Sequence, residues 1–245
     1  MKRFVSLTTL IIFGFSICGL AAEESIGSDR PVQATAEDLK YLQPTLDWLQ
    51  KIHPTYETYT LERLRDMKSL SLQLYSQSTA QLITDANMVH VGRLKNLEQL
   101  RVHRLIGDAG FAYFRELTNM RILNMPNCRI TDAGMVYLKT MTKLENLVMS
   151  ATNVSDKGIV YIMDKSALTL LNLTRTKITD AGLKELKGLT LLKKLFISYT
   201  GVSDASVPVL KSLTKLDTLY IQGTKISDNG LKEIQTALPN CRIVR

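Results

Sequence analysis

Seven aspartates recur along the chain at intervals of 23 or 24 residues, and they are the first candidates for chemistry. Regularly spaced carboxylates could bind calcium or supply an acid and base pair. Calcium, however, needs several oxygen ligands that converge on one point, and one carboxylate per interval does not supply them. Because most of these aspartates follow Ser or Thr where a predicted strand gives way to a predicted helix, we predict that they cap helices. The column consists of Asp85, Asp108, Asp132, Asp156, Asp180, Asp204 and Asp228.

The other candidates for catalysis or metal binding are three histidines that fall on different predicted elements. His53 precedes the repeated part of the chain, His90 falls on a predicted helix and His103 on a predicted strand, so they are not expected to converge on a metal ion. The sequence contains no G-x-S-x-G elbow, no H-E-x-x-H helix and no phosphate-binding loop. Catalysis needs non-repeated residues gathered in a pocket. We therefore predict that the protein is not an enzyme and holds no metal and no cofactor.

The elements that position these residues follow from a repeated phrase. The segment TRTKITDAGLKELKGLT (174–190) has near copies at 126–142 and 222–238. Aligning the phrase along the chain gives seven units and a final partial unit. They begin at Met67, Leu97, Met120, Leu144, Leu168, Leu192, Leu216 and, for the partial unit, Leu238.

The leucine spacing within a unit predicts one strand and one helix. Leu171 and Leu173 lie two residues apart, so both face the same side of a strand. Leu183, Leu186 and Leu189 lie three apart, so they line one face of a helix. A single strip of leucines is too small to stand alone, and stacked units join the strips into one continuous core.

The leucine pattern resembles that of a known family. In the unit beginning at Leu168, the strand leucines are followed by Thr176 and Ile178, which resembles the leucine-rich repeat signature. The resemblance covers residues 67–243. It implies an α/β fold, a right-handed leucine-rich repeat solenoid in which a curved parallel sheet is backed by helices, and it implies a role in protein recognition.

A finer resemblance concerns the phrase [ST]-D-x-G-L. It is similar to the cysteine-containing subtype of the family and to exported bacterial leucine-rich repeat proteins. Cys128 holds the subtype's Cys position, and Thr occupies that position in later units. Cys128 and Cys241 lie five repeats apart, beyond the reach of a disulfide, so we predict two buried free thiols.

The N-terminal residues are predicted to be a targeting segment. Lys2 and Arg3 precede an apolar run and small residues, so residues 1–21 indicate a secretory signal peptide and an exported protein, whether periplasmic, envelope-associated or extracellular. An uncleaved anchor or a lipoprotein signal at Cys18 is the alternative, and only such an anchor would bring the protein to a membrane. Residues 22–66 are predicted to form a linker and an α-helical N-terminal cap, and residues 67–245 the repeat domain.

The N-terminal cap is predicted from residues 35–51, whose leucines recur at helical spacing after Thr35 and Asp38 in a capping arrangement. Residues 61–67 are expected to complete it. Trp48 is expected to belong to the core of this cap.

Charge argues against nucleic acid as a partner. The chain of 245 residues has a formal net charge of +8, and the basic residues are interspersed with acidic ones in no long run. The composition, with 45% hydrophobic residues, is that of a globular protein.

The outward-facing positions of the strands are the candidate binding site. Apolar and aromatic residues gather on neighbouring strands late in the array, and a basic, polar group stands at its beginning. Exposed aromatics on a rigid sheet are typical anchors of a protein interface, although they could also merely shield the sheet. The candidate partner-binding residues are Leu170, Lys194, Phe196, Tyr199, Tyr220, Arg101 and His103.

These features together predict a non-catalytic protein-binding module that uses the concave face of the solenoid to hold an unidentified protein partner. A structural or envelope-anchored protein is the alternative. A third hypothesis is a substrate-recognition adaptor similar to F-box leucine-rich repeat proteins. No F-box segment precedes the repeats, and a signal peptide would contradict this hypothesis.

Overall fold

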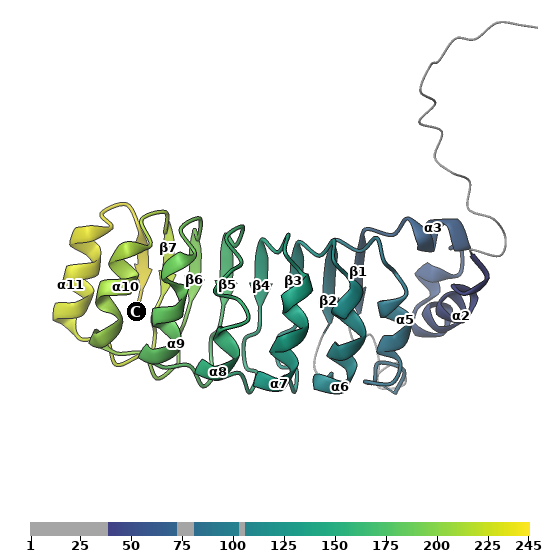
Figure 1. The fold of residues 1–245 in the computed structure, drawn as a ribbon, viewed down its shortest axis with the longest axis horizontal. Helices are drawn as coiled ribbons and strands as arrows, with labels where there is room; N and C mark the ends of the chain where they lie inside the picture. Colours follow the sequence, from purple (N-terminus) through teal and green to yellow (C-terminus); the bar gives the residue numbers. More distant parts are fainter. Residues whose placement is uncertain (1–38, 73–80, 103–105) are drawn as a thin grey trace, which may run out of the picture. The chain divides into compact units, whose positions relative to one another are not determined.

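Eight parallel strands form one sheet in the computed structural model, and they follow one another in sequence order from β1 to β8 (Figure 1). The model describes residues 39–72, 81–102 and 106–245, which belong to one compact unit, residues 34–245. The predicted signal peptide, the capping residues Thr35 and Asp38, and His103 lie outside the described residues.

Each strand is short and pairs in parallel with the strand of the next unit. The final strand comes from the partial unit at Leu238, so that unit completes the sheet as predicted. The order β1 to β8 confirms the predicted solenoid of repeated strand–helix units. The strands are β1 (Ser69–Leu72), β2 (Gln99–Val102), β3 (Ile122–Asn124), β4 (Asn146–Val148), β5 (Leu170–Asn172), β6 (Lys194–Phe196), β7 (Thr218–Tyr220) and β8 (Arg242–Val244).

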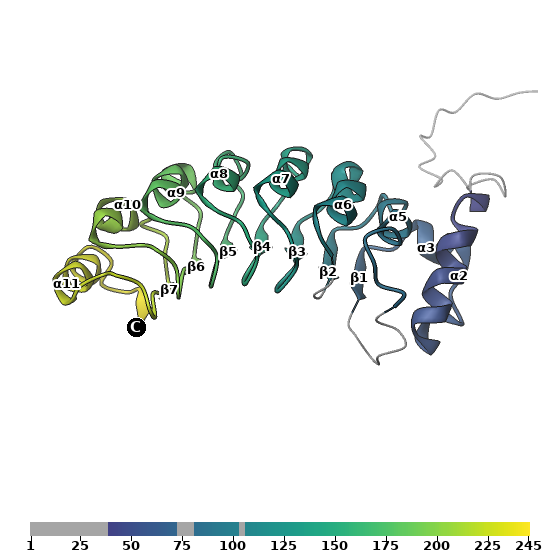
Figure 2. The same ribbon diagram turned by 90° about the horizontal axis from the view of Figure 1, so that it is seen from below.

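Helices cover one side of the sheet and leave the other side open (Figure 2). We call the open side the concave face, because the strands lie along the inner side of the array in this view. The helices of the repeats are α5 (Met88–Gly92), α6 (Asp108–Phe111), η2 (Ala112–Glu116), α7 (Asp132–Met135), η3 (Val136–Thr140), α8 (Asp156–Ile159), α9 (Asp180–Lys184), η4 (Glu185–Gly188), η5 (Asp204–Ser206), α10 (Val207–Ser212) and α11 (Asp228–Ala237).

Several units combine a short α-helix with a 3₁₀-helix where one helix was predicted. In the unit beginning at Leu168, α9 contains Leu183, η4 contains Leu186, and Leu189 follows directly; all three side chains are buried. A 3₁₀-helix has three residues per turn, so side chains three apart lie directly above one another. The tighter helix therefore suits a leucine spacing of three.

The N-terminal cap consists of α2 (Gln43–Ile52), the 3₁₀ turn η1 (Pro54–Tyr56) and α3 (Leu61–Arg65). The predicted helix over residues 35–51 is interrupted at residues 41–42, and α2 begins just before Pro44, a residue that favours the first turn of a helix. Trp48 is buried and its Nε1 donates a hydrogen bond to the carbonyl oxygen of Leu82 at 2.9 Å. Trp48 thus belongs to the cap's core, as predicted.

Cys128 and Cys241 are both buried and are not joined to each other by a disulfide, as predicted. Burial raises the pKa of the Cys241 thiol, and the negative charge of Asp217 raises it further. Both cysteines pack in the same continuous core as the leucines.

The aspartate column has a different hydrogen-bonding role from the one predicted. Where Ser or Thr directly precedes the aspartate at a helix start, its hydroxyl caps the helix: that of Thr131, for example, accepts a hydrogen bond from the backbone N–H of Ala133 at 3.2 Å. Asp132 is the first residue of the same helix, and its carboxylate reaches the next unit. It accepts from the backbone N–H of Ser155 at 2.7 Å and from the Ser155 hydroxyl at 2.6 Å.

This bridge between units recurs along the array. The carboxylates of Asp108, Asp156 and Asp180 accept the same pair of hydrogen bonds from Thr131, Thr179 and Ser203. At the ends of the column the pattern changes. Asp85 lies in a turn and accepts from the backbone N–H of Gly107 at 2.7 Å, Asp204 accepts from the backbone N–H of Ser227 at 2.8 Å, and Asp228 pairs with Arg245.

The glycine of the repeated phrase makes room for this carboxylate. A side-chain carbon on Gly158 would lie 2.7 Å from Asp132 Oδ1, so close that the carboxylate or the backbone would have to shift. Ser206 takes the glycine's place in one unit, and there the hydroxyl donates a hydrogen bond to the Asp180 carboxylate. The phrase [ST]-D-x-G-L therefore encodes a contact between neighbouring units.

Candidate functional site

Two rows of side chains point outward from the strands along the concave face. Parallel pairing aligns equivalent positions of successive units, so each row crosses the whole sheet. The first row is Ser69, Gln99, Ile122, Asn146, Leu170, Lys194, Thr218 and Arg242. The second row is Ser71, Arg101, Asn124, Val148, Asn172, Phe196, Tyr220 and Val244.

The two aromatic residues of the second row form a stacked pair. Phe196 on β6 and Tyr220 on β7 are register partners, and their ring centroids lie 4.8 Å apart with the planes inclined by 20°. Both side chains are half-buried. The strand spacing alone brings the rings to stacking distance, because adjacent strands lie about 4.8 Å apart.

Tyr199 lies in a different place from the one expected from sequence. It follows β6 in a turn, with φ at 57°, and its side chain is 52% exposed. Its ring packs against Gly223, whose φ of 65° falls in the left-handed region that glycine adopts without strain. Tyr199 therefore belongs to the edge where strands end, and among the described aromatic residues its ring is not paired with that of Phe196 or Tyr220.

Arg175 is a residue that the sequence reasoning missed. Its guanidinium lies over the Tyr199 ring, 5.0 Å from the centroid, in a cation–π arrangement. Arg175 also has positive φ, at the position of its own unit that Tyr199 occupies in the next. The contact between Arg175 and Tyr199 could have been predicted from the 24-residue period, because residues at equivalent positions in adjacent units lie side by side.

Leu170 and Lys194 are register partners in the first row. The Leu170 side chain is half-buried and that of Lys194 is exposed. Lys194 and Phe196 stand two residues apart on β6 and so project from the same side of the sheet. The late part of the concave face thus combines an aromatic pair with an apolar residue and a positive charge.

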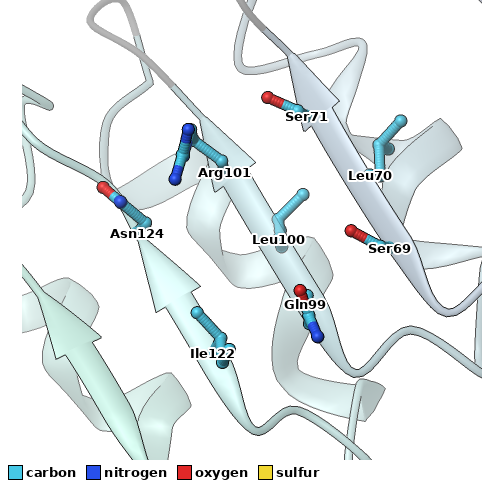
Figure 3. Close-up of a pocket in the computed structure, with 8 residues that line it drawn as sticks. All are labelled: Ser69, Leu70, Ser71, Gln99, Leu100, Arg101, Ile122 and Asn124. Atoms are coloured by element: carbon cyan, nitrogen blue, oxygen red, sulfur yellow. The ribbon is translucent and has the colours of Figure 1, made fainter. Parts of the chain in front are cut away.

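Arg101 stands at the other end of the array, near a separate hollow (Figure 3). Its guanidinium lies between Ser71 on β1 and Asn124 on β3 in this view. The hollow has a volume of about 230 Å³ and is lined by residues of β1, β2 and β3. His103, the other basic candidate here, is outside the described residues, so the predicted basic group is represented by Arg101.

The described residues offer no metal centre. No group of three or more His, Cys, Asp or Glu side chains among them could hold a metal ion. The aspartate carboxylates are instead engaged by hydroxyl and backbone donors of the next unit. Among the described helices, none is long and apolar enough to cross a bilayer.

Two segments of the chain, residues 116–139 and 166–187, match the family model described as Leucine Rich repeat. Each segment contains one strand, β3 or β5, and the helix that follows it. These two segments are similar to leucine-rich repeats. A search of the curated proteins finds no match. Membership of the cysteine-containing subtype stays a prediction.

Solved structures similar to this chain include two internalins of Listeria monocytogenes. The internalin inlF is 22% identical with a TM-score of 0.57, over 74% of this chain and 48% of the internalin, so the match spans about half of that protein. Internalin C2 is 16% identical with a TM-score of 0.60, over 84% of this chain and 95% of the internalin. At these identities the likeness shows the fold.

Proposed function

We propose that this chain is a non-catalytic protein-binding module that contacts its partner through the concave face. The observation that carries the proposal is the stacked pair of Phe196 and Tyr220, with ring centroids 4.8 Å apart on the side of the sheet that no helix covers. Aromatic residues are enriched among those that carry most of the binding energy in protein interfaces. The pair stands next to Leu170 and Lys194, which extend it with an apolar and a charged contact.

The rigidity of the sheet supports the same proposal. The pair rests on a row whose positions are fixed by strand pairing, and the strands are backed by fully buried leucines such as Leu171, Leu195 and Leu219. A preformed surface loses little conformational entropy when a partner binds. A repeat array also presents neighbouring units as one extended surface, which suits recognition of a protein.

We further propose that the protein acts outside the cytoplasm. The support is the sequence of residues 1–21, with Lys2 and Arg3 before an apolar run and small residues at the cleavage spacing. The module would be membrane-bound only if this segment were retained as an anchor. The intact mass of the protein purified from its native source distinguishes cleavage from retention.

A pull-down followed by a binding titration tests the use of the concave face. The immobilised protein is used to recover a partner from the surrounding medium or envelope, and its affinity is compared with that of the double variant Phe196→Ala and Tyr220→Ala. We expect a loss of about 30-fold or more, which corresponds to ~2 kcal/mol for hot-spot residues. The thermal midpoint should change little, because these rings project away from the leucine core.

A control uses more exposed apolar residues on the helical side. Val160 and Met163 are 43% and 47% exposed, so the double variant Val160→Ala and Met163→Ala removes accessible apolar surface elsewhere. This control should bind the partner like the parent. If the aromatic variant also bound like the parent, the rings would only shield the sheet, and the proposal for this face would fail.

A further inference from the structure

The hollow at the β1 end of the concave face contains two buried polar atoms for which the described part of the chain supplies no hydrogen-bond partner. Ser71 Oγ and Asn124 Oδ1 are both shielded from solvent, and neither has a hydrogen-bond partner among the described residues. Leaving a buried polar atom without a hydrogen bond destabilises the folded protein. One orphan is a hydroxyl, which can donate, and the other is a carbonyl oxygen, which can only accept. A ligand that accepts from the hydroxyl and donates to the carbonyl oxygen would satisfy both.

Arg101 supplies the charge of this hollow. It lies between Ser71 and Asn124 in the strand register, its side chain is exposed, and it forms no ion pair with any residue that the structure describes. No Asp or Glu is among the described residues that line the hollow. An unpaired guanidinium presents a planar fork of N–H donors whose geometry matches a carboxylate.

The charge of the two outward-facing rows also favours a negatively charged partner. The two outward-facing rows defined above contain no Asp and no Glu, and they contain three cations, Arg101, Lys194 and Arg242. Complementary charge favours an acidic partner and speeds its encounter with the surface.

The size of the hollow limits what can occupy it. Its volume of about 230 Å³ lies below the roughly 300–1,000 Å³ of sites for drug-sized ligands and cofactors. Its lining includes the outward-facing apolar side chain of Ile122 beside the polar groups. A short aliphatic stem that ends in a carboxylate fits both the volume and this combination of apolar and polar groups.

We infer that the hollow takes the side chain of an aspartate or glutamate in an extended segment of the protein partner. The carboxylate accepts hydrogen bonds from the Arg101 guanidinium and the Ser71 hydroxyl, and a backbone N–H of the segment donates to Asn124 Oδ1. This inference rests on the proposed function and adds the chemistry of the partner.

The register also gives a spacing for the partner. Arg101 and Phe196 belong to the same row, and four strand spacings of about 4.8 Å separate them, or roughly 19 Å. An extended chain advances about 3.3 Å per residue, so an acidic residue and an apolar anchor about six residues apart would reach both places.

NMR titration with designed peptides tests the inference. The probe is the blocked peptide acetyl-Gly-Glu-Gly-Ser-Gly-Ser-Gly-Trp-Gly-amide, and its control replaces Glu with Gln. The readout is the Arg101 Nε–Hε signal of the full chain, assigned by its loss in Arg101→Lys. The Glu peptide should shift this signal and bind about tenfold more tightly than the Gln peptide, as expected for one charge-assisted contact.

Two variants test whether Arg101 is responsible for the preference for the Glu peptide over the Gln peptide. Arg101→Gln should bind the two peptides equally, whereas Arg242→Gln, which removes a cation at the far end of the same sheet, should keep the preference for Glu. Sodium acetate at matched ionic strength supplies the same carboxylate without a peptide. Acetate should bind far more weakly than the Glu peptide, and equal affinity would mean a site for small acids and overturn the inference.

Failure of this inference is distinct from failure of the proposed function. If the parent bound the Glu and Gln peptides equally, the acidic pocket would be refuted, even where the natural partner was lost from the Phe196→Ala and Tyr220→Ala variant. In that variant both peptides should weaken while the preference for Glu is retained, because Arg101 is unchanged.

Discussion

The Asp156 carboxylate of one unit holds the start of the next helix through Thr179. Asp156 Oδ1 accepts from the Thr179 backbone N–H at 2.7 Å, and Oδ2 accepts from the Thr179 hydroxyl at 2.7 Å. The same hydroxyl accepts from the backbone N–H of Ala181 at 3.3 Å and so caps α9. One carboxylate therefore fixes the position and the hydroxyl orientation of the next unit's helix cap.

Asp156→Ala should lower the free energy of unfolding by about 1–3 kcal/mol, because it leaves two donors of Thr179 without their charged acceptor. Urea unfolding followed by circular dichroism measures the change. Asp66→Ala is the control, since Asp66 makes an exposed ion pair with Arg65 and should matter by less than ~1 kcal/mol. Equal effects of the two substitutions would contradict a bridging role for Asp156.

Gly182→Ala should also destabilise the protein, although Ala is normally the better helix residue. A side-chain carbon at Gly182 would collide with the Asp156 carboxylate, and relieving that collision should cost about 1–3 kcal/mol. Gly188→Ala is the matched control: the new carbon would meet only the Met163 carbonyl oxygen at 3.4 Å, and the change should be neutral or stabilising.

A double-mutant cycle separates the carboxylate collision from a general intolerance of Ala at Gly182. In the Asp156→Ala background most of the cost of Gly182→Ala should disappear, giving a coupling of about 0.5–3 kcal/mol. Additive effects would show that the glycine is required for another reason.

Lys165 is a buried cation in a column of apolar residues. The equivalent positions of the neighbouring units are Met141 and Leu189, while the Lys165 side chain is 1% exposed. Its Nζ pairs with Asp164 at 2.8 Å and donates to the Lys139 carbonyl oxygen at 3.3 Å. Removing a charge from water is costly, and replacing a buried ion by an apolar residue of similar volume is often stabilising.

We therefore expect Lys165→Met to raise the free energy of unfolding by about 1 kcal/mol or more. Lys187→Met, at an exposed helical position, should stay within about 0.5 kcal/mol of the parent. Thermal and urea unfolding of both variants provide the measurement. A less stable Lys165→Met would mean that the two polar contacts outweigh the cost of burial.

The protonation of His90 should make the stability of the protein depend on pH. Its ring stacks on Trp48 at a centroid distance of 5.0 Å, burial lowers the pKa of the imidazole, and the positive charge of Arg93 lowers it further. Because the folded pKa lies below the unfolded value of about 6.5, the unfolded chain takes up a proton first as the pH falls. Stability is therefore full above that value and is lost as the pH drops through it towards the folded pKa.

Trp48 is the sole tryptophan of the sequence, so its fluorescence reports on the cap during urea unfolding at each pH. The loss of stability between about pH 7 and pH 5 should be smaller in His90→Phe, which keeps an aromatic partner for Trp48 but cannot titrate. An unchanged pH profile in that variant would assign the effect to other groups.

Local spacing in the sequence determined the repeat fold. Leucines two apart define strands, leucines three apart define helices, and the period of about 24 residues requires units that share one core. These relationships involve residues close together in the chain, so they can be inferred without coordinates. The same period predicted that Phe196 and Tyr220 would be neighbours, because parallel pairing without a register shift places equivalent positions side by side.

Contacts between units depend on the direction of each side chain, and only the tertiary structure decided them. The sequence predicted that Asp132 lies at the start of a helix. That its carboxylate bonds to Ser155 of the next unit, and not to its own helix, depends on the distance between units and on the space left by Gly158. Likewise, the turn after β6 takes Tyr199 away from the stacked rings and towards Arg175. The unpaired atoms beside Arg101 arise from packing three strands together, and no single strand's sequence contains that information.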